Sequence, residues 1–290
     1  MIDLHTHSTA SDGTDSPAEL IAKAVATGID TLAVTDHDTT GGWGSAVQAV
    51  QQLDTSFTLV RGTEFSCAYF APDGQRTGLH LLGYLFDPDA EDLKAERARL
   101  RDNRLGRGEK IVQNLIAAGY PITWDRVVEI AQGGSVGRPH LGRALVEAGV
   151  VTSVNEAFTD LLSSSSPYYV PKQDMAVLDA IELIRRAGGV PVIAHAWARK
   201  RGKVLAPDVL AQLVESGMLG IEVDHPDHAP EDRQGLRDLA NDLGVLATGS
   251  SDYHGTNKTI RLAAETTSRQ SFERLVDLAS GAELIRSPAR

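Results

Sequence analysis

The stretch MIDLHTH, residues 1–7, consists of a short apolar segment followed by two histidines at alternate positions. Residues 2–4 are typical of a buried strand, and alternate side chains of a strand point to the same side. The imidazoles of His5 and His7 can therefore reach one point in space. Imidazole is the most common metal ligand in proteins, so the pattern predicts half of a metal site at the end of this strand. Two unconnected surface histidines are the alternative.

Outward from this segment, strand-like and helix-like stretches alternate along most of the chain. The expected strands cover residues 2–4, 31–35, 57–65, 79–86, 190–194, 220–223 and 245–248, and the expected helices cover residues 17–28, 45–53, 91–118, 124–131, 141–148, 175–187, 207–216 and 230–243. Repeated units of this kind indicate an α/β fold with a parallel sheet, open or closed into a barrel. Helices follow one another between residues 99 and 165, so we expect a helical insert there that caps a barrel domain formed by residues 1–98 and 166–290.

The composition is that of a soluble globular protein. The chain has 290 residues, of which 42% are hydrophobic and 23% are charged, and it contains one cysteine. We expect no membrane span, because no run approaches eighteen apolar residues. We also expect no secretory signal and a cytoplasmic location. The net charge of −11 disfavours duplex DNA as a partner, since binding DNA rests largely on neutralising phosphates.

Histidines and acidic residues recur at or near the ends of the expected strands, except Asp12 in the loop after the first strand and His80 within the fourth. They are Asp12, Asp36, His37, Glu64, His80, His195, Asp224, His225, Asp252 and His254. Functional groups of parallel α/β folds collect at the carboxyl ends of strands, and structural histidines alone do not explain so many coincidences. The set contains no thiolate, which suits Mn, Fe or Zn in a catalytic site rather than a cysteine cluster. It is also too large for one ion, so we expect two or three divalent metal ions.

Several short motifs resemble those of the polymerase and histidinol phosphatase (PHP) family. They are DLHTH at residues 3–7, TDH at 35–37 and SDYH at 251–254. The opening HTHS at 5–8 and SDGT at 11–14, together with GRPH at 137–140 and YVPK at 169–172, resembles the family's small bacterial nucleotide phosphoesterases. The resemblance covers essentially the whole chain and implies a distorted seven-stranded (β/α) barrel with a trinuclear metal site.

The resemblance also implies how three ions would share their ligands. His5, His7, Glu64 and Asp252 would hold one ion, Asp12, His37 and His254 a second, and Glu64, His80 and His195 a third, with Glu64 bridging. Histidinol phosphatases of the family tend to have histidine where this chain has Asp12, which argues against histidinol phosphate as the substrate.

The function implied is that of a metal-dependent phosphoesterase acting on small phosphorylated nucleotides. Three divalent ions outweigh three carboxylates and a bridging hydroxide, leaving a charge of about +2 that matches a phosphomonoester dianion. The resemblance points to the 3′-phosphate of nucleoside 3′,5′-bisphosphates. The alternatives are a 5′→3′ exoribonuclease acting on short oligoribonucleotides, a histidinol-phosphatase-like enzyme, and a non-catalytic module like the PHP domains fused to polymerases.

Further residues are candidates for catalysis and substrate binding. Asp36 could orient a ligand histidine or belong to an ordinary turn, and Arg138 and His140 could clamp a phosphate or lie on the surface. Lys172 and Arg199 are further substrate-binding candidates, although the basic run that includes Arg199 could be solvated. His225 and His228 are candidates for protonating the leaving group. Arg97, Arg101 and Arg104 share one helix face, which we expect to be solvated.

Overall fold

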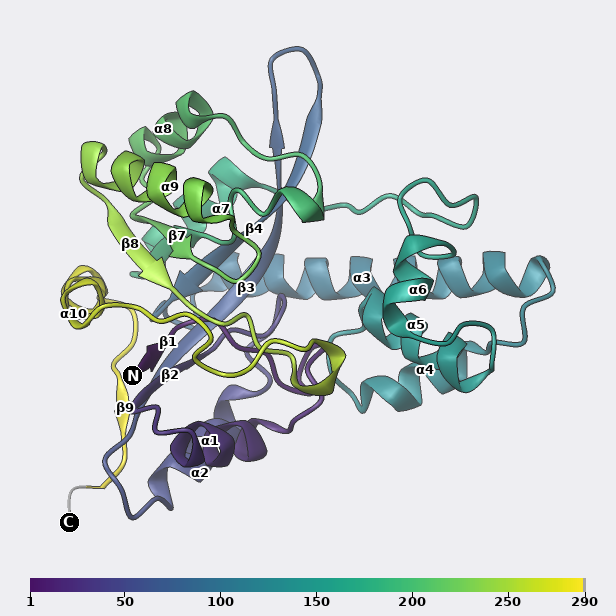
Figure 1. Cartoon of the computed structure of the whole chain (residues 1–290), viewed down its shortest axis with the longest axis horizontal. Helices are drawn as coiled ribbons and strands as arrows, with labels where there is room; N and C mark the ends of the chain where they lie inside the picture. Colours follow the sequence, from purple (N-terminus) through teal and green to yellow (C-terminus); the bar gives the residue numbers. More distant parts are fainter. Residues whose placement is uncertain (289–290) are drawn as a thin grey trace.

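The computed structural model describes residues 1–288, and its elements follow the expected alternation (Figure 1). The strands are β1 (Ile2–Asp3), β2 (Thr31–Val34), β3 (Thr58–Phe70), β4 (Arg76–Tyr84), β5 (Met175–Ala176), β6 (Val190–Ile193), β7 (Gly220–Asp224), β8 (Leu246–Gly249) and β9 (Ile285–Arg286). The helices are α1 (Pro17–Ala26), α2 (Trp43–Gln51), α3 (Glu91–Ala117), α4 (Trp124–Ala131), α5 (Arg138–Glu147), α6 (Val154–Thr159), α7 (Val177–Arg186), α8 (Pro207–Glu215), α9 (Pro230–Asp242) and α10 (Arg269–Leu278). Short 3₁₀ turns cover Arg199–Arg201 and Gly255–Asn257.

The sheet forms a nearly closed barrel in the order β1-β2-β3-β4-β6-β7-β8. Its two ends approach each other beyond β1 and β8, where the backbone N–H of His7 donates to the carbonyl of Tyr253 at 2.9 Å. The predicted distorted seven-stranded barrel is thus confirmed. The expectation of a wholly parallel sheet is wrong at β4, which runs antiparallel to both β3 and β6. The reason is a tight turn at residues 71–75 that reverses the chain directly, whereas a parallel connection needs a crossover.

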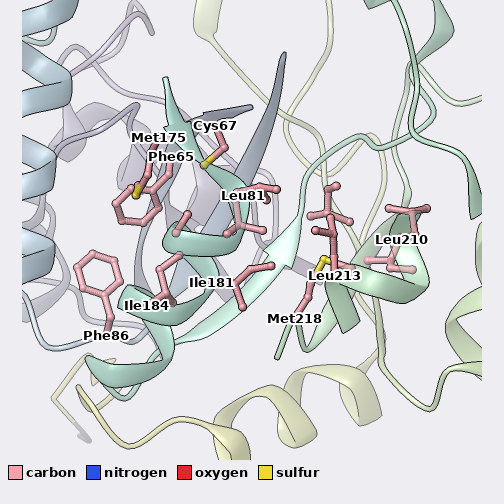
Figure 2. Close-up of a cluster of buried hydrophobic side chains, with 14 of the residues drawn as sticks. Phe65, Cys67, Leu81, Phe86, Met175, Ile181, Ile184, Leu210, Leu213 and Met218 are labelled. Atoms are coloured by element: carbon pink, nitrogen blue, oxygen red, sulfur yellow. The ribbon is translucent and has the colours of Figure 1, made fainter. Parts of the chain in front are cut away.

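The hairpin formed by β3 and β4 is longer than the sequence predicts and projects beyond the barrel (Figure 1). Helices α7, α8 and α9 cover one flank of the sheet. Figure 2 shows part of the resulting core, in which Phe65 and Leu81 of the hairpin meet Ile181 of α7 and Leu213 of α8. Burying each such side chain contributes roughly 1.5–3 kcal/mol, so this packing holds the strands whose ends carry the site.

Helices α3 to α6 form a lobe beside the barrel with a hydrophobic core of its own (Figure 1). The 27-residue helix α3 belongs to both parts, because Leu93 and Leu100 pack in the barrel core and Ile111 and Leu115 pack in the lobe. The predicted boundary at residue 99 therefore falls inside a continuous helix.

One face of α3 differs from the prediction. We expected Arg97 and Arg104 to be solvated, but Arg97 is buried with its guanidinium against the carbonyl of Pro88, and Arg104 pairs with the buried Asp38. Arg97 and Arg104 turn inward because α3 packs against the barrel core through Leu93 and Leu100, whereas Arg101 is exposed as predicted. Among the described residues, every helix is too short or too polar to cross a lipid bilayer.

Candidate metal centre

The end of β1 places two histidines inside the barrel. His5 and His7 are fully buried, and their Nε2 atoms face each other at 3.1 Å. Glu64 Oε2 lies 3.3 Å from the Nε2 of His5 and 3.1 Å from that of His7, and Asp252 Oδ1 lies 3.4 Å from each. Strand β3 supplies Glu64, and the loop after β8 supplies Asp252. Four potential ligand atoms thus converge on one point.

A second group lies next to the first. His7, Asp12, His37 and His254 offer ligand atoms within 4.8 Å of one another, and all four side chains are buried. Asp12 occupies the middle of the group, with Oδ1 3.4 Å from the Nε2 of His254 and Oδ2 3.7 Å from the Nε2 of His37.

Glu64 connects these groups to a third. Its Oε1 lies 2.7 Å from the Nδ1 of His80 and 3.0 Å from the Nε2 of His195, while its Oε2 lies 3.1 Å from the Nδ1 of His37. The carboxylate therefore turns one oxygen to each side, as a bridging ligand would. The structure brings together all nine side chains that the sequence nominates as ligands.

Hydrogen bonds at the rear of the rings show that the cluster suits cations. The Nδ1 of His5 faces Glu222 Oε1 at 3.0 Å, and the Nδ1 of His254 faces the carbonyl of Asp252 at 2.8 Å. Both partners are acceptors, so each neutral ring holds its proton on Nδ1 and turns a lone pair on Nε2 inward. The Nδ1 of His37 is buried and makes no hydrogen bond, although Glu64 Oε2 lies 3.1 Å from it. The cluster thus turns imidazole lone pairs and carboxylate oxygens toward one another. This set of nitrogen and oxygen ligands is suited to binding divalent ions.

The electrostatics agree with this fit. Burial lowers the pKa of His5, but the carboxylates of Glu64, Glu222 and Asp252 outweigh burial and raise that pKa well above its ordinary value. The pKa of His7 rises to about 9, since bonds to Asp252 and Glu64 overcome the effect of burial. The centre therefore stabilises positive charge, whether it is carried by protons or by metal ions.

The outer histidines behave differently. Burial, reinforced by Arg201, lowers the pKa of His195 to about 3, and burial with the cation of Lys258 lowers that of His254 to about 3. These rings are neutral at physiological pH, which is the form that binds metal.

Backbone strain accompanies the cluster. His195 and Asp252 have φ angles of +32° and +53°, and Asp38 beside them has +54°. Non-glycine residues in this left-handed region cost of order 1–3 kcal/mol each, and such residues gather at functional sites.

Asp36 supports the site from behind. Its carboxylate accepts hydrogen bonds from the backbone N–H and hydroxyl of Ser8 and from the hydroxyl of Ser11, at 2.6–2.8 Å. The hydroxyl of Ser11 in turn lies 3.4 Å from the Nδ1 of His7. Asp36 thus reaches a ligand histidine only through the loop that it holds in place.

A cavity of about 150 Å³ joins the centre to the helical lobe. Asp12, His37 and His80 line its barrel side, and its far side carries four cationic side chains, those of Arg104, Arg107, Arg138 and Lys172. Sequence analysis nominated Arg138 and Lys172 and missed Arg104 and Arg107, because charges on a long helix usually indicate a solvated face.

Two of these cations donate to backbone carbonyls rather than to a carboxylate: Arg107 to Val170 at 2.7 Å and Arg138 to Leu162 at 2.9 Å. The Nη2 atom of Arg107 is buried without a hydrogen-bond partner, and the guanidinium of Arg138 lies 5.0 Å from the Phe158 ring. Burial, reinforced by Arg104 and Arg138 and opposed by Asp174, lowers the pKa of Lys172 to about 8. Asp38, which pairs with Arg104, and Asp174 also line the cavity, so Arg107 and Arg138 are the cations best suited to an anion.

His140 lies at the start of α5 between the lobe and the metal centre. It is buried, and its Nδ1 accepts a hydrogen bond from the backbone N–H of Gly137 at 3.0 Å. Asp12 raises the pKa of His140, but burial outweighs this effect and the pKa falls below its ordinary value.

Two other candidates lie apart from the cavity. His228 uses both ring nitrogens within the fold, with Nδ1 donating to the carbonyl of Val223 and Nε2 accepting from the backbone N–H of Trp197. Arg199 turns to the surface and pairs with Asp232 at 2.7 Å. The structure therefore does not bring these two together with the metal ligands.

Three side chains surround the far oxygen of Asp252. Arg201 and Lys258 each donate to Oδ2 at 2.7 Å, and the Nε2 of His225 lies 3.4 Å from it. His225 is fully buried, and its Nδ1 accepts from the backbone N–H of Asp227. The ring of His225 thus lies behind Asp252.

Sequence analysis also missed two buried carboxylates. Asp3 accepts hydrogen bonds from the backbone and hydroxyl of Ser251, and Glu222 lies fully buried in β7. The available signal is a charged residue within an otherwise apolar strand, as in GIEVD at residues 220–224.

Comparisons with known proteins agree with this geometry. The model of the PHP domain family matches residues 3–117. The 3′,5′-nucleoside bisphosphate phosphatase of Chromobacterium violaceum is 33% identical over 87% of this chain and 87% of its own, and the 5′-3′ exoribonuclease Rnm of Salmonella typhimurium is 30% identical over 87% and 84%. A solved structure from Bifidobacterium adolescentis, described as a candidate metal-dependent phosphoesterase, superposes with a TM-score of 0.89 at 32% identity and covers 96% of both chains.

Proposed function

Because this chain belongs to the PHP domain family and is therefore a metal-dependent hydrolase of phosphoester bonds, we propose that it removes the 3′-phosphate from nucleoside 3′,5′-bisphosphates. We further propose that two or three divalent ions, of Mn, Fe or Zn, bind at the three groups of ligands, and that residues 99–165 cap the site.

The cationic wall of the cavity is the observation that carries the proposal. A monoester needs one anion site, which the metal centre provides. Arg107 and Arg138 form a second place for negative charge across the same cavity, so a small substrate with two phosphates fits both. Arg suits this role because its planar fork binds phosphate with two parallel hydrogen bonds.

Different residues of the chain have different roles in the proposed reaction. When bound, divalent ions would supply hydroxide at neutral pH and polarise the reacting phosphate. Glu64 connects the ligand groups through its two carboxylate oxygens, and Arg107 and Arg138, with Lys172 beside them, bind the second phosphate. His225 carries its proton on Nε2 and orients Asp252; we propose this role rather than protonation of the leaving group because the ring is fully buried.

The cations of the lobe also disfavour histidinol phosphate as a substrate. That molecule carries an ammonium group, which Arg104, Arg107, Arg138 and Lys172 would repel across the cavity.

The second candidate substrate is short RNA with a 5′-phosphate. Arg201 and Lys258 favour it, since they are partly exposed on the other side of Asp252, where the next phosphodiester could lie.

Comparing four substrates tests the proposal. Adenosine 3′,5′-bisphosphate, AMP, histidinol phosphate and a short 5′-phosphorylated RNA are each incubated with the metal-loaded enzyme, and phosphate and nucleotide products are quantified. The expected result is the highest kcat/KM with the bisphosphate, giving AMP and phosphate. A clear preference for histidinol phosphate would overturn the proposal, and a preference for RNA would support the second candidate.

A further inference from the structure

Glu222 lies at the centre of β7 with its side chain beneath the metal ligands. Its Oε1 faces the Nδ1 of His5 at 3.0 Å and accepts from the hydroxyl of Ser250, while its Oε2 accepts from the backbone N–H of His195 at 2.7 Å. These partners come from three different parts of the barrel. Both carboxylate oxygens are therefore engaged within the protein, which leaves Glu222 supporting ligands rather than binding metal itself.

We propose that Glu222 is a positioning residue for two metal sites: it holds His5 in the tautomer that binds metal through Nε2, and it fixes the backbone that presents His195. The inference rests on the metal centre and is independent of the substrate proposed above.

The hydrogen bond to Glu222 fixes the tautomer of His5. An ionised carboxylate only accepts hydrogen bonds, so the Nδ1 of His5 must donate to Glu222. The Nε2 of His5 then presents its lone pair to the point shared by His7, Glu64 and Asp252. With an amide at position 222, the NH₂ group could donate to Nδ1 instead. The proton would then move to Nε2, where it would occupy the metal position.

The backbone of His195 is also held by Glu222. Its φ of +32° lies in the left-handed region, and its N–H donates to Glu222 Oε2. A strained residue of this kind persists only where its surroundings hold it. The bond directs the ring to the interior, where the Nε2 of His195 lies 3.0 Å from Glu64 Oε1. Loss of the acceptor would let this turn relax away from the shared carboxylate.

The test compares Glu222→Gln with Ser250→Ala. The first keeps the shape of the side chain but removes its obligatory acceptor character, and the second removes one donor and keeps the carboxylate. Zn²⁺ affinity is measured by competition with a chromophoric chelator, and metal content is measured by elemental analysis after dialysis. We expect Glu222→Gln to lose about 10- to 100-fold in affinity, as changes behind a metal ligand typically do, and Ser250→Ala to stay within about threefold. Unchanged affinity in Glu222→Gln would overturn the proposal.

Nitrogen NMR of ¹⁵N-histidine-labelled, zinc-loaded wild-type protein supplies a readout that does not depend on how a variant folds. The expected spectrum has the His5 proton on Nδ1 and zinc on Nε2, with the ring nitrogens assigned by through-bond correlation to the backbone of His5. A His5 ring that binds zinc through Nδ1 would contradict the proposal. Because neither measurement uses a nucleotide, failure of the proposed substrate and failure of this inference are distinguishable.

Discussion

Arg201 donates a 2.7 Å hydrogen bond to the Oδ2 atom of Asp252, whose Oδ1 atom faces the Nε2 atoms of His5 and His7. One carboxylate thus stands between a protein cation and the metal centre. Its side chain is only 1% exposed, so its charge must be balanced from both sides.

This arrangement predicts that Arg201→Met destabilises the metal-free protein more than the metal-loaded protein. The expected loss in the free energy of unfolding is about 1–3 kcal/mol in chelator, since removing one partner leaves a buried charge less compensated, and it shrinks when metal supplies that compensation. Urea unfolding with and without Zn²⁺ measures both values. The matched control is Arg199→Met, which breaks a surface pair expected to contribute under about 1 kcal/mol. An equal loss in both states would contradict the account of Asp252.

Metal binding should release protons. With its pKa raised to about 9, His7 carries an extra proton at pH 7 in the metal-free chain, and the neighbouring carboxylates raise the pKa of His5 in the same direction. Metal needs the neutral rings, so affinity should rise with pH up to about 9. Calorimetric titration of Zn²⁺ in buffers of different ionisation enthalpy measures the proton count, for which we expect a value of one to two, roughly. Enthalpies that do not depend on the buffer would refute this prediction.

The cationic wall of the cavity should affect the turnover of the substrate and leave metal binding unchanged. Arg138→Ala is expected to lower kcat/KM for adenosine 3′,5′-bisphosphate by about 10- to 100-fold, corresponding to the loss of a charge-assisted hydrogen bond, with metal content unchanged. Arg126→Ala is the control, since Arg126 pairs with Glu129 and Glu147 on the outside of the lobe. If Arg138→Ala leaves the kinetics of every tested nucleotide intact, the lobe is only structural.

The lobe also touches the loop that carries Asp12. The backbone N–H of Ser135 donates to the carbonyl of Ala10 at 2.8 Å, and a Cβ atom at Gly134 would lie 2.3 Å from the carbonyl oxygen of Thr9. Gly134→Ala should therefore push this loop, costing about 1–3 kcal/mol of stability as overpacking does and weakening metal binding. Gly106→Ala, in open space on α3, is the control. Equal thermal midpoints and metal affinities for the two variants would argue against this contact.

Several ligands could be predicted from the sequence because they follow a short apolar strand, as His5 and His195 do, whereas Asp12 lies in a loop and His80 lies within β4. The closing of the sheet could then be expected to bring them together. Other features depend on tertiary contacts that no local pattern encodes. The inward turn of Arg104 requires α3 to pack against the barrel beside Asp38 and Ser66. The antiparallel direction of β4 follows from a turn whose length the strand pattern did not reveal. Arg199 and Arg201 stand two positions apart, yet only Arg201 reaches the metal centre.

The most direct test of the account measures bound metal and phosphate release in the same samples. Wild-type protein is stripped with chelator, checked by elemental analysis, assayed on adenosine 3′,5′-bisphosphate and then reloaded with Mn²⁺, alongside His5→Ala and Asp252→Ala. The account predicts that activity disappears with the metal and returns with Mn²⁺ in the wild type, and that both variants lose metal and activity together. Full activity in verified metal-free protein would contradict it.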